Sequence, residues 1–447
     1  MIKIYDTMTR SLRDFVPLTE NVVNMYVCGP TVYNYIHIGN ARSAVAFDTI
    51  RRYFEYCGYT VNYISNFTDV DDKIIKAANE AGISTKELSD KFIAAFMEDT
   101  AQLGIKPATQ NPRVINYMDE IIAFVSILID KGFAYVAEGD VYFRVAKSKN
   151  YAKLANKTLE DLEIGASGRT DAETDRKENP LDFALWKAAK EGEISWESPW
   201  GPGRPGWHIE CSVMATEILG DTIDIHGGGA DLEFPHHTNE IAQSEAKTGK
   251  TFANYWMHNG FVNVDNEKMS KSLGNFVTVH DMLKTVDGQV LRFFLATQQY
   301  RKPINFTEKA IHDAEVNLKY LKNTHSLPLT DQVNQDELQT YLDAFQVAMD
   351  DDFNTANGVT VLFDMAKWIN SGNYDETVKD AFEKMLQVFG IVFEEEVLDE
   401  DIEKLIEERQ AARANKDFAT ADRIRDELAA QGIKLLDTKE GVRWTRD

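Results

Sequence analysis

The sequence is informative first for what it has little of. Its 447 residues include three cysteines, Cys28, Cys57 and Cys211, and so small and odd a number cannot build a disulfide framework. No apolar run approaches the roughly 20 residues that a membrane-spanning helix requires. Residues 1–10 also lack the apolar core of a signal peptide. We therefore expect a cytoplasmic protein without a membrane segment.

Positive charge is also scarce. The chain has 48 lysines and arginines against 72 acidic residues, which gives a net charge of −24 and a pI of about 4.8. Nucleic-acid-binding proteins usually carry a basic footprint, so composition by itself favours a metabolic enzyme. The acidic excess is uneven, because residues 331–400 contain 17 acidic and 3 basic residues, whereas residues 401–447 contain 11 and 10. RNA contact would therefore need a local basic face.

The pattern of apolar residues near the N-terminus predicts the fold class. Residues 25–28 indicate a short apolar strand, residues 41–56 have apolar residues at helical spacing, and residues 59–64 are rich in β-branched and aromatic residues. This order of strand, loop, helix and strand predicts an α/β fold with a doubly wound, parallel, Rossmann-type sheet. The chemistry of such a sheet lies at the carboxyl end of the first strand, beside the helix N-terminus.

Later segments predict how this sheet is divided. We expect a helix over 117–131, a hairpin at 135–143 that turns at Glu138-Gly139-Asp140, strands at 224–229 and 255–264, and a helix over 235–247. Residues 307–389 are predicted to be helical, and the tail to hold helices at 402–414 and 418–431 and strands at 433–436 and 442–445. The predicted domains are a first catalytic half (1–110), a connective insertion (111–196), a second catalytic half (197–306), a helical domain (307–395) and a C-terminal domain (396–447).

Two short motifs predict a site for ATP. The first is His37-Ile38-Gly39-Asn40, shortly after the first strand, and the second is Lys268-Met269-Ser270-Lys271-Ser272. A glycine after a strand lets the backbone approach a nucleotide, a helix N-terminus attracts phosphate, and lysines supply positive charge to departing pyrophosphate. Taken alone, the first motif could be an ordinary helix cap and the second a solvated loop. Their joint presence on an α/β layout argues against both.

Together the motifs resemble the HIGH and KMSKS signatures of class I aminoacyl-tRNA synthetases, with Asn40 where the general class has histidine. Longer segments are similar to the cysteinyl-tRNA synthetase family, which commonly shows this asparagine: residues 26–42, 66–75, 182–187, 203–212 and 226–237. The resemblance spans nearly the whole chain. It implies that a cysteine carboxylate attacks the α-phosphorus of ATP, accompanied by magnesium, and that the cysteinyl group then passes to the 3′ end of tRNA(Cys). It assigns ATP to His37, Gly39, Asn40, Lys268, Ser270 and Lys271.

The same family places one zinc ion in the amino-acid pocket. The resemblance gives this ion the ligands Cys28, Cys211, His236 and Glu240, and it lines the pocket with Thr68, Trp207 and His226. Spacing alone would not reveal the site, although the His236 and Glu240 side chains would share one helical face. Zinc binds thiolate better than hydroxyl, which would separate cysteine from serine without an editing domain.

Ordinary structural roles remain open for these residues on pattern alone. Cys211 could be a small core residue and Trp207 a core aromatic, while Thr68 could cap a helix that begins near Asp69. The pair His236 and Glu240 could be a hydrogen-bonded surface pair. Cys57, at the end of the first helix, is interpreted as a packing residue.

By resemblance, the helical region and the tail contact tRNA and read the anticodon. The tail offers Trp444 as a stacking face for an unpaired base. It offers phosphate contacts from Arg409, Arg413, Arg423, Arg425, Lys434, Arg443 and Arg446. These cations could equally be solvated helix charges balanced by nearby carboxylates. We expect the protein to be a monomer.

Other functions stay open at this point. A ligase that joins activated cysteine to an amino sugar, as in mycothiol biosynthesis, would share the catalytic core and the zinc site, but it is expected to lack a full tail. A non-catalytic, zinc-containing RNA-binding protein would not need intact ATP motifs. A persulfide-forming side activity with pyridoxal phosphate on a lysine of residues 73–76 or 268–271 is linked to the family, but nothing in the spacing requires it.

Overall fold

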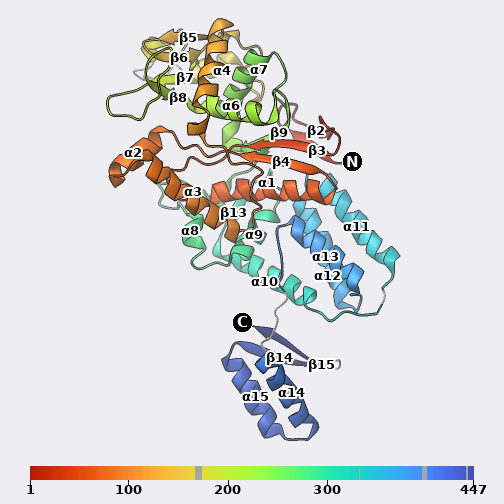
Figure 1. Ribbon diagram of the computed structural model, residues 1–447. Coiled ribbons are helices and arrows are strands. Elements are labelled where there is room, and N and C mark those ends of the chain that lie inside the picture. Colours follow the sequence, from red (N-terminus) through yellow and green to blue (C-terminus); the bar gives the residue numbers. More distant parts are fainter. Residues whose placement is uncertain (167–173, 332, 395–399, 439–440, 447) are drawn as a thin grey trace. The chain divides into compact units, whose positions relative to one another are not determined.

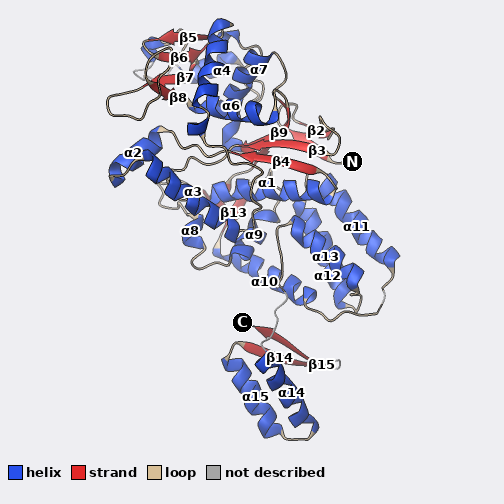
Figure 2. Cartoon of the chain, viewed as in Figure 1, coloured by secondary structure: helices blue, strands red, loops and turns tan. Residues whose placement is uncertain are grey.

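The structure is a computed structural model that describes residues 1–166, 174–331, 333–394, 400–438 and 441–446 (Figures 1 and 2). These residues form two compact units, 1–392 and 393–447. Within the described residues, no helix is both long and apolar enough to cross a bilayer.

The centre of the larger unit is a four-stranded parallel sheet in the order β10-β9-β3-β4. Its strands are β3 (Val22–Val27), β4 (Thr60–Ser65), β9 (Ile223–Gly229) and β10 (Ala253–Asn259). Tyr26 of β3 lies between Ile64 of β4 and His226 of β9. The strand order reverses between β3 and β9, which is where doubly wound sheets bind their ligands. The predicted fold class is confirmed.

Helices cover both faces of this sheet (Figure 1). One face packs on α1 (Ile38–Tyr56), and the other lies beneath α4 (Met118–Asp130), α6 (Trp207–Leu219) and α7 (Thr238–Thr248). The helix predicted over 41–56 is therefore present, and it begins earlier because His37 and Asn40 cap it. Further helices, α2 (Asp72–Ala81) and α3 (Thr85–Gln102), follow β4.

The predicted insertion, residues 111–196, supplies three strands of an antiparallel sheet in the order β5-β6-β7-β8, whereas the fourth strand lies beyond its predicted end. Its strands are β5 (Ala134–Ala137), β6 (Asp140–Phe143), β7 (Phe183–Ala188) and β8 (Gly203–Pro205), and α5 (Leu159–Ala166) lies between β6 and β7 in sequence. Glu138 and Gly139 both have positive φ angles, so the predicted hairpin turn is confirmed. Residues 167–173 of this insertion lie outside the described residues.

The single strand predicted over 255–264 is wrong, because the chain breaks there into two strands of different sheets. β10 ends at Asn259, and β11 (Val262–Val264) joins a three-stranded sheet with β12 (Glu267–Lys268) and β13 (Ile304–Phe306). The break falls at Gly260, where a Cβ atom would lie 2.5 Å from the Lys302 carbonyl carbon. Close approach of two backbone segments therefore decides where the strand ends.

The helix predicted over 235–247 begins three residues later than expected. Residues 233–237 are irregular, with Phe234 in extended backbone and a cis peptide bond before Pro235, and the regular helix α7 starts at Thr238. As a result, His236 and His237 lie in the turn that enters the helix.

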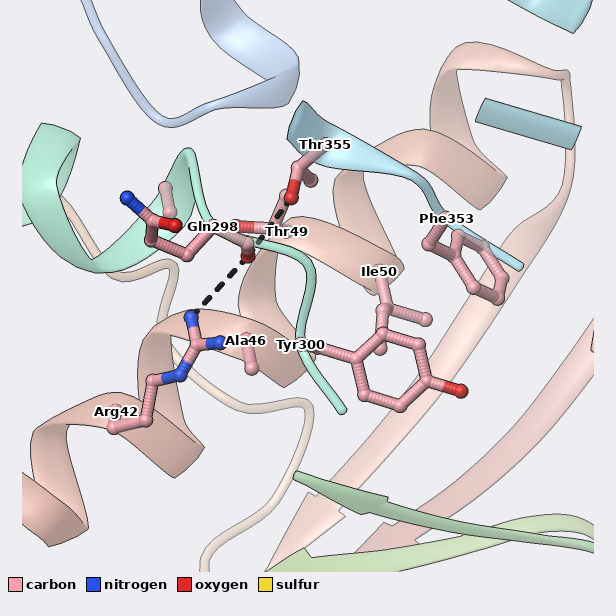
Figure 3. Close-up of a pocket in the computed structure, with 9 residues that line it drawn as sticks. Arg42, Ala46, Thr49, Ile50, Gln298, Tyr300, Phe353 and Thr355 are labelled. Carbon is pink, nitrogen blue, oxygen red and sulfur yellow. Dashed lines mark hydrogen bonds between the residues drawn. The ribbon is translucent and has the colours of Figure 1, made fainter. Parts of the chain in front are cut away.

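The segment after α9 (Gly288–Ala296) ties α1 to the helical region (Figure 3). The buried guanidinium of Arg42 on α1 donates hydrogen bonds to the backbone carbonyls of Leu295, Gln298 and Gln299. Thr355 donates a 2.9 Å hydrogen bond to the same Gln298 carbonyl, and these side chains border a cavity of about 10 Å³. The carbonyls at a helix C-terminus stabilise a cation, so the end of α9 is fixed against α1.

The helices predicted between 307 and 389 are confirmed as α10 (Glu308–His325), α11 (Gln335–Asp350), α12 (Thr355–Asn370) and α13 (Glu376–Val388). The remaining elements of this unit are a hairpin of β1 (Lys3–Asp6) and β2 (Ser11–Asp14) and the short helix α8 (Val279–Met282).

The smaller unit has the predicted order of two helices and two strands. Its elements are α14 (Glu400–Ala414), α15 (Phe418–Ala430), β14 (Ile433–Thr438) and β15 (Gly441–Arg446), and the strands pair antiparallel. Its core joins Ile402, Ile424, Leu428 and Ile433.

Candidate active site and metal centre

The candidate metal centre lies at the carboxyl ends of the paired strands β3 and β9. Cys28 directly follows β3, Cys211 comes from the buried face of α6, and Glu240 from the first turn of α7. His236 comes from the turn before α7. Four segments that are distant in sequence therefore meet at the switch point of the sheet.

Ligand-type atoms of these four residues all lie within 4.8 Å of one another. The Cys28 Sγ atom is 3.7 Å from Cys211 Sγ and 3.5 Å from Glu240 Oε1, and His236 Nε2 is 3.0 Å from the same oxygen. His236 and Glu240 have side chains that are 1% and 0% exposed. They form a hydrogen-bonded pair, but a buried one, so the alternative of a surface pair is wrong.

A second group of ligand-type atoms overlaps the first: Cys28, His226, His237 and Glu240. The partners of each atom favour the first group. His226 Nε2 is already bonded to Glu240 Oε2 at 2.6 Å, and the second nitrogen of His236 lies 3.0 Å from His208 Nδ1. In the first group His236 Nε2 and Glu240 Oε1 face the cluster, while His236 Nδ1 and Glu240 Oε2 contact other histidines. Metal ligands are usually oriented by such a second hydrogen bond.

Electrostatics already favour a cation at this position. Hydrogen bonding from Cys28 lowers the pKa of Cys211 to about 6, while burial raises the pKa of Cys28 well above the usual thiol value. Against the opposing effect of burial, His226 and His236 lower the pKa of Glu240 to about 2. Against the effect of burial, Glu240 and Cys211 raise the pKa of His236 to about 10. The cluster therefore holds a thiolate and a carboxylate beside a thiol and a protonated imidazole, and loss of the protons of the last two would give a donor set typical of zinc.

The residues assigned to the amino-acid pocket lie around this cluster. Trp207 is 41% exposed and its ring stacks on His236 with centroids 4.2 Å apart, so the alternative of a core aromatic is wrong. Thr68 is buried beside Pro30 and accepts a 3.1 Å hydrogen bond from Asn66. It does not cap a helix, because the N-cap of α2 is Asp71. His226 lies beneath the cluster, bonded to Glu240.

The first ATP motif is a helix cap as well as a candidate ligand site. His37 Nδ1 accepts the Asn40 N–H at 3.2 Å, and Asn40 Oδ1 accepts the His37 N–H at 3.1 Å, a reciprocal capping box. A Cβ atom on Gly39 would lie 2.8 Å from the His37 ring, so glycine leaves room for the ring. The alternative of an ordinary cap is thus correct for the local structure, and it leaves the Nε2–H of His37 to donate elsewhere.

Burial, Lys271 and Lys73 lower the pKa of His37 to about 4. The ring is therefore a neutral donor near pH 7. The last residues of the second motif's loop pair with this segment: the Ile38 N–H donates to the Val277 carbonyl at 3.1 Å. The structure thus brings the two motifs together.

The two motif lysines differ in their surroundings. Lys271 lies over the rings of Tyr33 and Phe276, 5.3 Å from each centroid, and Phe276 contacts the His37 ring edge-on. Lys268 instead lies over Phe261, 5.9 Å from its centroid. Ser270 organises the loop, because its N–H donates to Asn275 and its hydroxyl accepts from the Leu273 N–H. Both lysines are exposed.

Several neighbours of the site were not found from the sequence. Five of the nine histidines gather at the metal cluster, including three that carried no assignment: His208, His237 and His258. Lys73 of α2 lies over Tyr33, on the ring that Lys271 also contacts. The rarity of histidine in the chain was the one signal available for the first three.

The tail residues assigned to RNA divide into two groups. Arg409 is buried and makes two 2.9 Å hydrogen bonds to Asp437, and Arg413 pairs with the same carboxylate. The assignment of Arg409 as a phosphate contact is therefore wrong, because its guanidinium holds α14 to β14. Arg423 and Arg425 pair with carboxylates on their own helix, as the alternative of balanced surface charges expected.

Comparison with known families covers almost the whole chain. Residues 14–316 match the catalytic domain of class I (C) tRNA synthetases, residues 344–394 match the DALR domain, and residues 395–444 match the anticodon binding domain of cysteinyl-tRNA ligase.

Curated relatives match from end to end. A cysteine–tRNA ligase of Streptococcus thermophilus (strain CNRZ 1066) is 96% identical over 447 residues, which is 100% of both chains. One from Streptococcus agalactiae serotype V (strain ATCC BAA-611 / 2603 V/R) is 82% identical over the same span. A solved structure of Mycobacterium tuberculosis methionyl-tRNA synthetase with methionyl-adenylate is similar in fold, with a TM-score of 0.60, 15% identity, and coverage of 82% of this chain and 89% of that one.

Proposed function

The chain belongs to the cysteine–tRNA ligase family of class I aminoacyl-tRNA synthetases, and we propose that its metal cluster selects cysteine while its two motifs hold ATP. It is an ATP-dependent ligase that joins cysteine to tRNA. The anticodon-binding match in the tail removes the amino-sugar ligase, which was expected to lack such a tail, from consideration. This assignment of the two roles rests on one observation. The four candidate metal ligands meet at Cys28, directly after β3, and the capped helix α1 begins only ten residues after Cys28.

Zinc is the metal that suits the cluster best. Cys28, Cys211, His236 and Glu240 would hold it, because two sulfurs, an imidazole and a carboxylate form a favoured zinc donor set. A bound zinc ion would accept the thiolate of substrate cysteine far better than the hydroxyl of serine. His226 and His208 would orient the ligating carboxylate and imidazole through the bonds described above.

The amino-acid pocket extends from this cluster. Trp207, stacked on His236 and partly exposed, would cover the bound amino acid. Thr68 lies in the segment that pairs with residues 30–32, next to Cys28, and would close the opposite side. This arrangement would leave the substrate carboxylate directed toward the N-terminus of α1.

The ATP side would act through charge and orientation. The neutral His37 ring would donate its Nε2–H to a phosphate oxygen, and Gly39 and Asn40 would bring the α1 backbone close to it. Lys271, Lys268 and Ser270 would stabilise the negative charge that develops on the departing pyrophosphate, with magnesium accompanying the nucleotide. Attack of the cysteine carboxylate on the α-phosphorus then forms cysteinyl-adenylate and releases pyrophosphate.

The second step needs less from the protein, because the adenylate is already activated. The terminal ribose hydroxyl of tRNA(Cys) would attack its carbonyl carbon, with transfer of the cysteinyl group and release of AMP. The smaller unit would bind the anticodon region through exposed Arg446 and through the partly buried Trp444. We place the enzyme in the cytoplasm as a monomer.

The decisive experiment measures aminoacylation of total tRNA with cysteine and with serine, before and after zinc is removed by a chelator. We expect charging with cysteine alone, loss of that charging when zinc is removed, and recovery when zinc is restored. Charging with serine, or charging that is indifferent to zinc, would contradict the proposed selection by metal. ATP–pyrophosphate exchange under the same conditions would place the loss in the first step.

A further inference from the structure

The two ATP motifs are joined by a short stretch of paired backbone, residues 36–38 against residues 277–279, which we call the motif junction. Besides the bond from Ile38 to Val277, the Val279 N–H donates to the Ile36 carbonyl at 2.9 Å. His37 and Thr278 are the bridge partners between these bonds. Because Lys271 lies only six residues before Val277, the junction limits how far this lysine can move from α1.

His280 follows the junction directly and contacts two other elements. Its ring stacks on Tyr35, with centroids 4.2 Å apart and planes 17° apart, and Tyr35 belongs to the loop that leads into α1. The other side of Tyr35 packs edge-on against Phe92 of α3. His280 Nδ1 lies 3.2 Å from Asp99 Oδ1, also on α3. One side chain therefore connects the end of the second motif's loop, the start of the first motif and the neighbouring helix.

Asp99 is an unusual residue to place at this position. It is 1% exposed, and its Oδ2 atom has no hydrogen-bond partner among the residues that the structure describes. Burying a carboxylate with one satisfied oxygen is unfavourable. The charged side chains that follow His280 do not offset this cost, since Asp281 of α8 and Lys284, just after that helix, pair with each other at the surface. Among the residues that the structure describes, the bond to His280 is the one side-chain hydrogen bond that Asp99 makes.

We propose that His280 and Asp99 form a positioning pair that fixes the motif junction and thereby holds Lys271 beside the phosphates of ATP. Neither residue belongs to a motif or to the metal cluster. The geometry connects them to Lys271 through Tyr33 and Tyr35 of one loop, because Lys271 lies over Tyr33 and His280 stacks on Tyr35. This inference rests on the proposed role of Lys271 in ATP activation.

The test uses the full-length, zinc-loaded enzyme and measures cysteine-dependent ATP–pyrophosphate exchange. His280→Phe keeps a ring on Tyr35 but removes the bond to Asp99, and Asp99→Leu removes the same bond from the other side. We expect each change to lower kcat about tenfold, because small misplacements of a catalytic group are costly. The KM for cysteine and the zinc content should not change, since the metal cluster shares no residue with the pair.

Two further variants separate positioning from general destabilisation. Asp99→Asn keeps an oxygen that can accept a hydrogen bond from His280 Nδ1 and should restore most of the rate. The double variant His280→Phe/Asp99→Leu should be no slower than either single variant, because both remove one interaction. Lys284→Gln, on the same turn but paired with Asp281 at the surface, is the matched control and should leave the rate unchanged.

Each alternative outcome is distinguishable. A normal kcat in His280→Phe, while Lys271→Ala abolishes exchange, would overturn the positioning pair and leave the proposed function intact. Retained exchange in Lys271→Ala would overturn the proposed role of the lysine itself. The proposal would also be contradicted if His280→Phe weakened the use of ATP and of cysteine equally, lowered the melting temperature and was not matched by a rescue in Asp99→Asn. The pair would then be a structural contact only.

Discussion

The cysteine side of the site is built from buried side chains that bond to one another, whereas the ATP side presents exposed lysines on a loop. His236 and Glu240 are almost wholly buried and share a 3.0 Å contact. Lys268 and Lys271 are exposed and contact aromatic faces. The two halves of one active site therefore differ in how much of their arrangement exists before a substrate arrives.

This difference predicts two kinds of mutant. A change in the buried cluster leaves neighbouring polar groups without partners, which affects both binding and the stability of the fold. A change in the exposed lysines removes charge that acts on the ligand and leaves the fold unchanged. The capped start of α1 lies between these cases, because it is part of the fold and also faces the ATP site.

The largest expected effect is that of Cys211→Ser. We expect the affinity for zinc to fall at least about 100-fold, because even partners outside the ligand shell cost 10–100-fold in metal affinity, and the bound zinc and the cysteine-dependent exchange should fall with it. Metal analysis and exchange kinetics provide the measurement. Cys57→Ser, a thiol away from the cluster, is the matched control. Full zinc content in Cys211→Ser would show that the second group, with His226 and His237, binds the metal instead.

The next effect is that of Lys271→Ala, which tests the exposed half. Loss of a group that stabilises developing charge costs about 2.7–4 kcal/mol, so kcat for exchange should fall by about 10²–10³-fold. The melting temperature and zinc content should match those of the wild-type protein. Lys309→Ala, an exposed lysine on α10, serves as the control. A clear drop in melting temperature would contradict the distinction between a buried cysteine side that supports the fold and an exposed ATP side that does not.

A smaller effect distinguishes the two roles of Asn40. Asn40→Ala removes the bond from the His37 N–H to Asn40 Oδ1, while its own N–H can still donate to His37 Nδ1, and should destabilise the protein by about 0.5–1 kcal/mol. Asn40→Asp keeps the cap, because a carboxylate can accept the same His37 N–H, but it places negative charge beside the phosphates. We therefore expect near-normal thermal stability with slower exchange in Asn40→Asp. If both variants exchanged pyrophosphate at the wild-type rate, Asn40 would have a structural role only.

Near pH 7 the smallest effect is a pH dependence from His37, which grows only as the pH falls below about 6.5. Its pKa is about 4 in the folded protein and near 6.5 when unfolded, so the unfolded state binds the extra proton between these values. This site therefore lowers the free energy of unfolding as pH falls from about 6.5 towards 4. His37→Asn, which keeps a capping side chain, should lose less stability over that range. Thermal denaturation at several pH values would show it, and a His37 resonance that titrates above pH 6 would disprove it.

Local chemistry made much of the fold predictable. The helix α1 follows from apolar spacing and from its capping residues, and the hairpin at Glu138 and Gly139 follows from a turn that favours positive φ. Two boundaries were not predictable in this way. The break at Gly260 depends on the approach of Lys302, and the late start of α7 depends on the irregular turn before Thr238.

The sequence by itself determined the elements, the family resemblance and the identity of the motif residues, because these are local properties of the chain. Its local patterns carried no signal for contacts between distant segments, and only the family resemblance indicated that Cys28 and Cys211 meet. Cys28 and Cys211 meet across 183 positions and His280 and Asp99 across 181. Only the tertiary structure decided these contacts, because the parallel sheet and its helices bring the segments together. Burial beside one another then shifts the pKa values of these thiols, carboxylates and imidazoles.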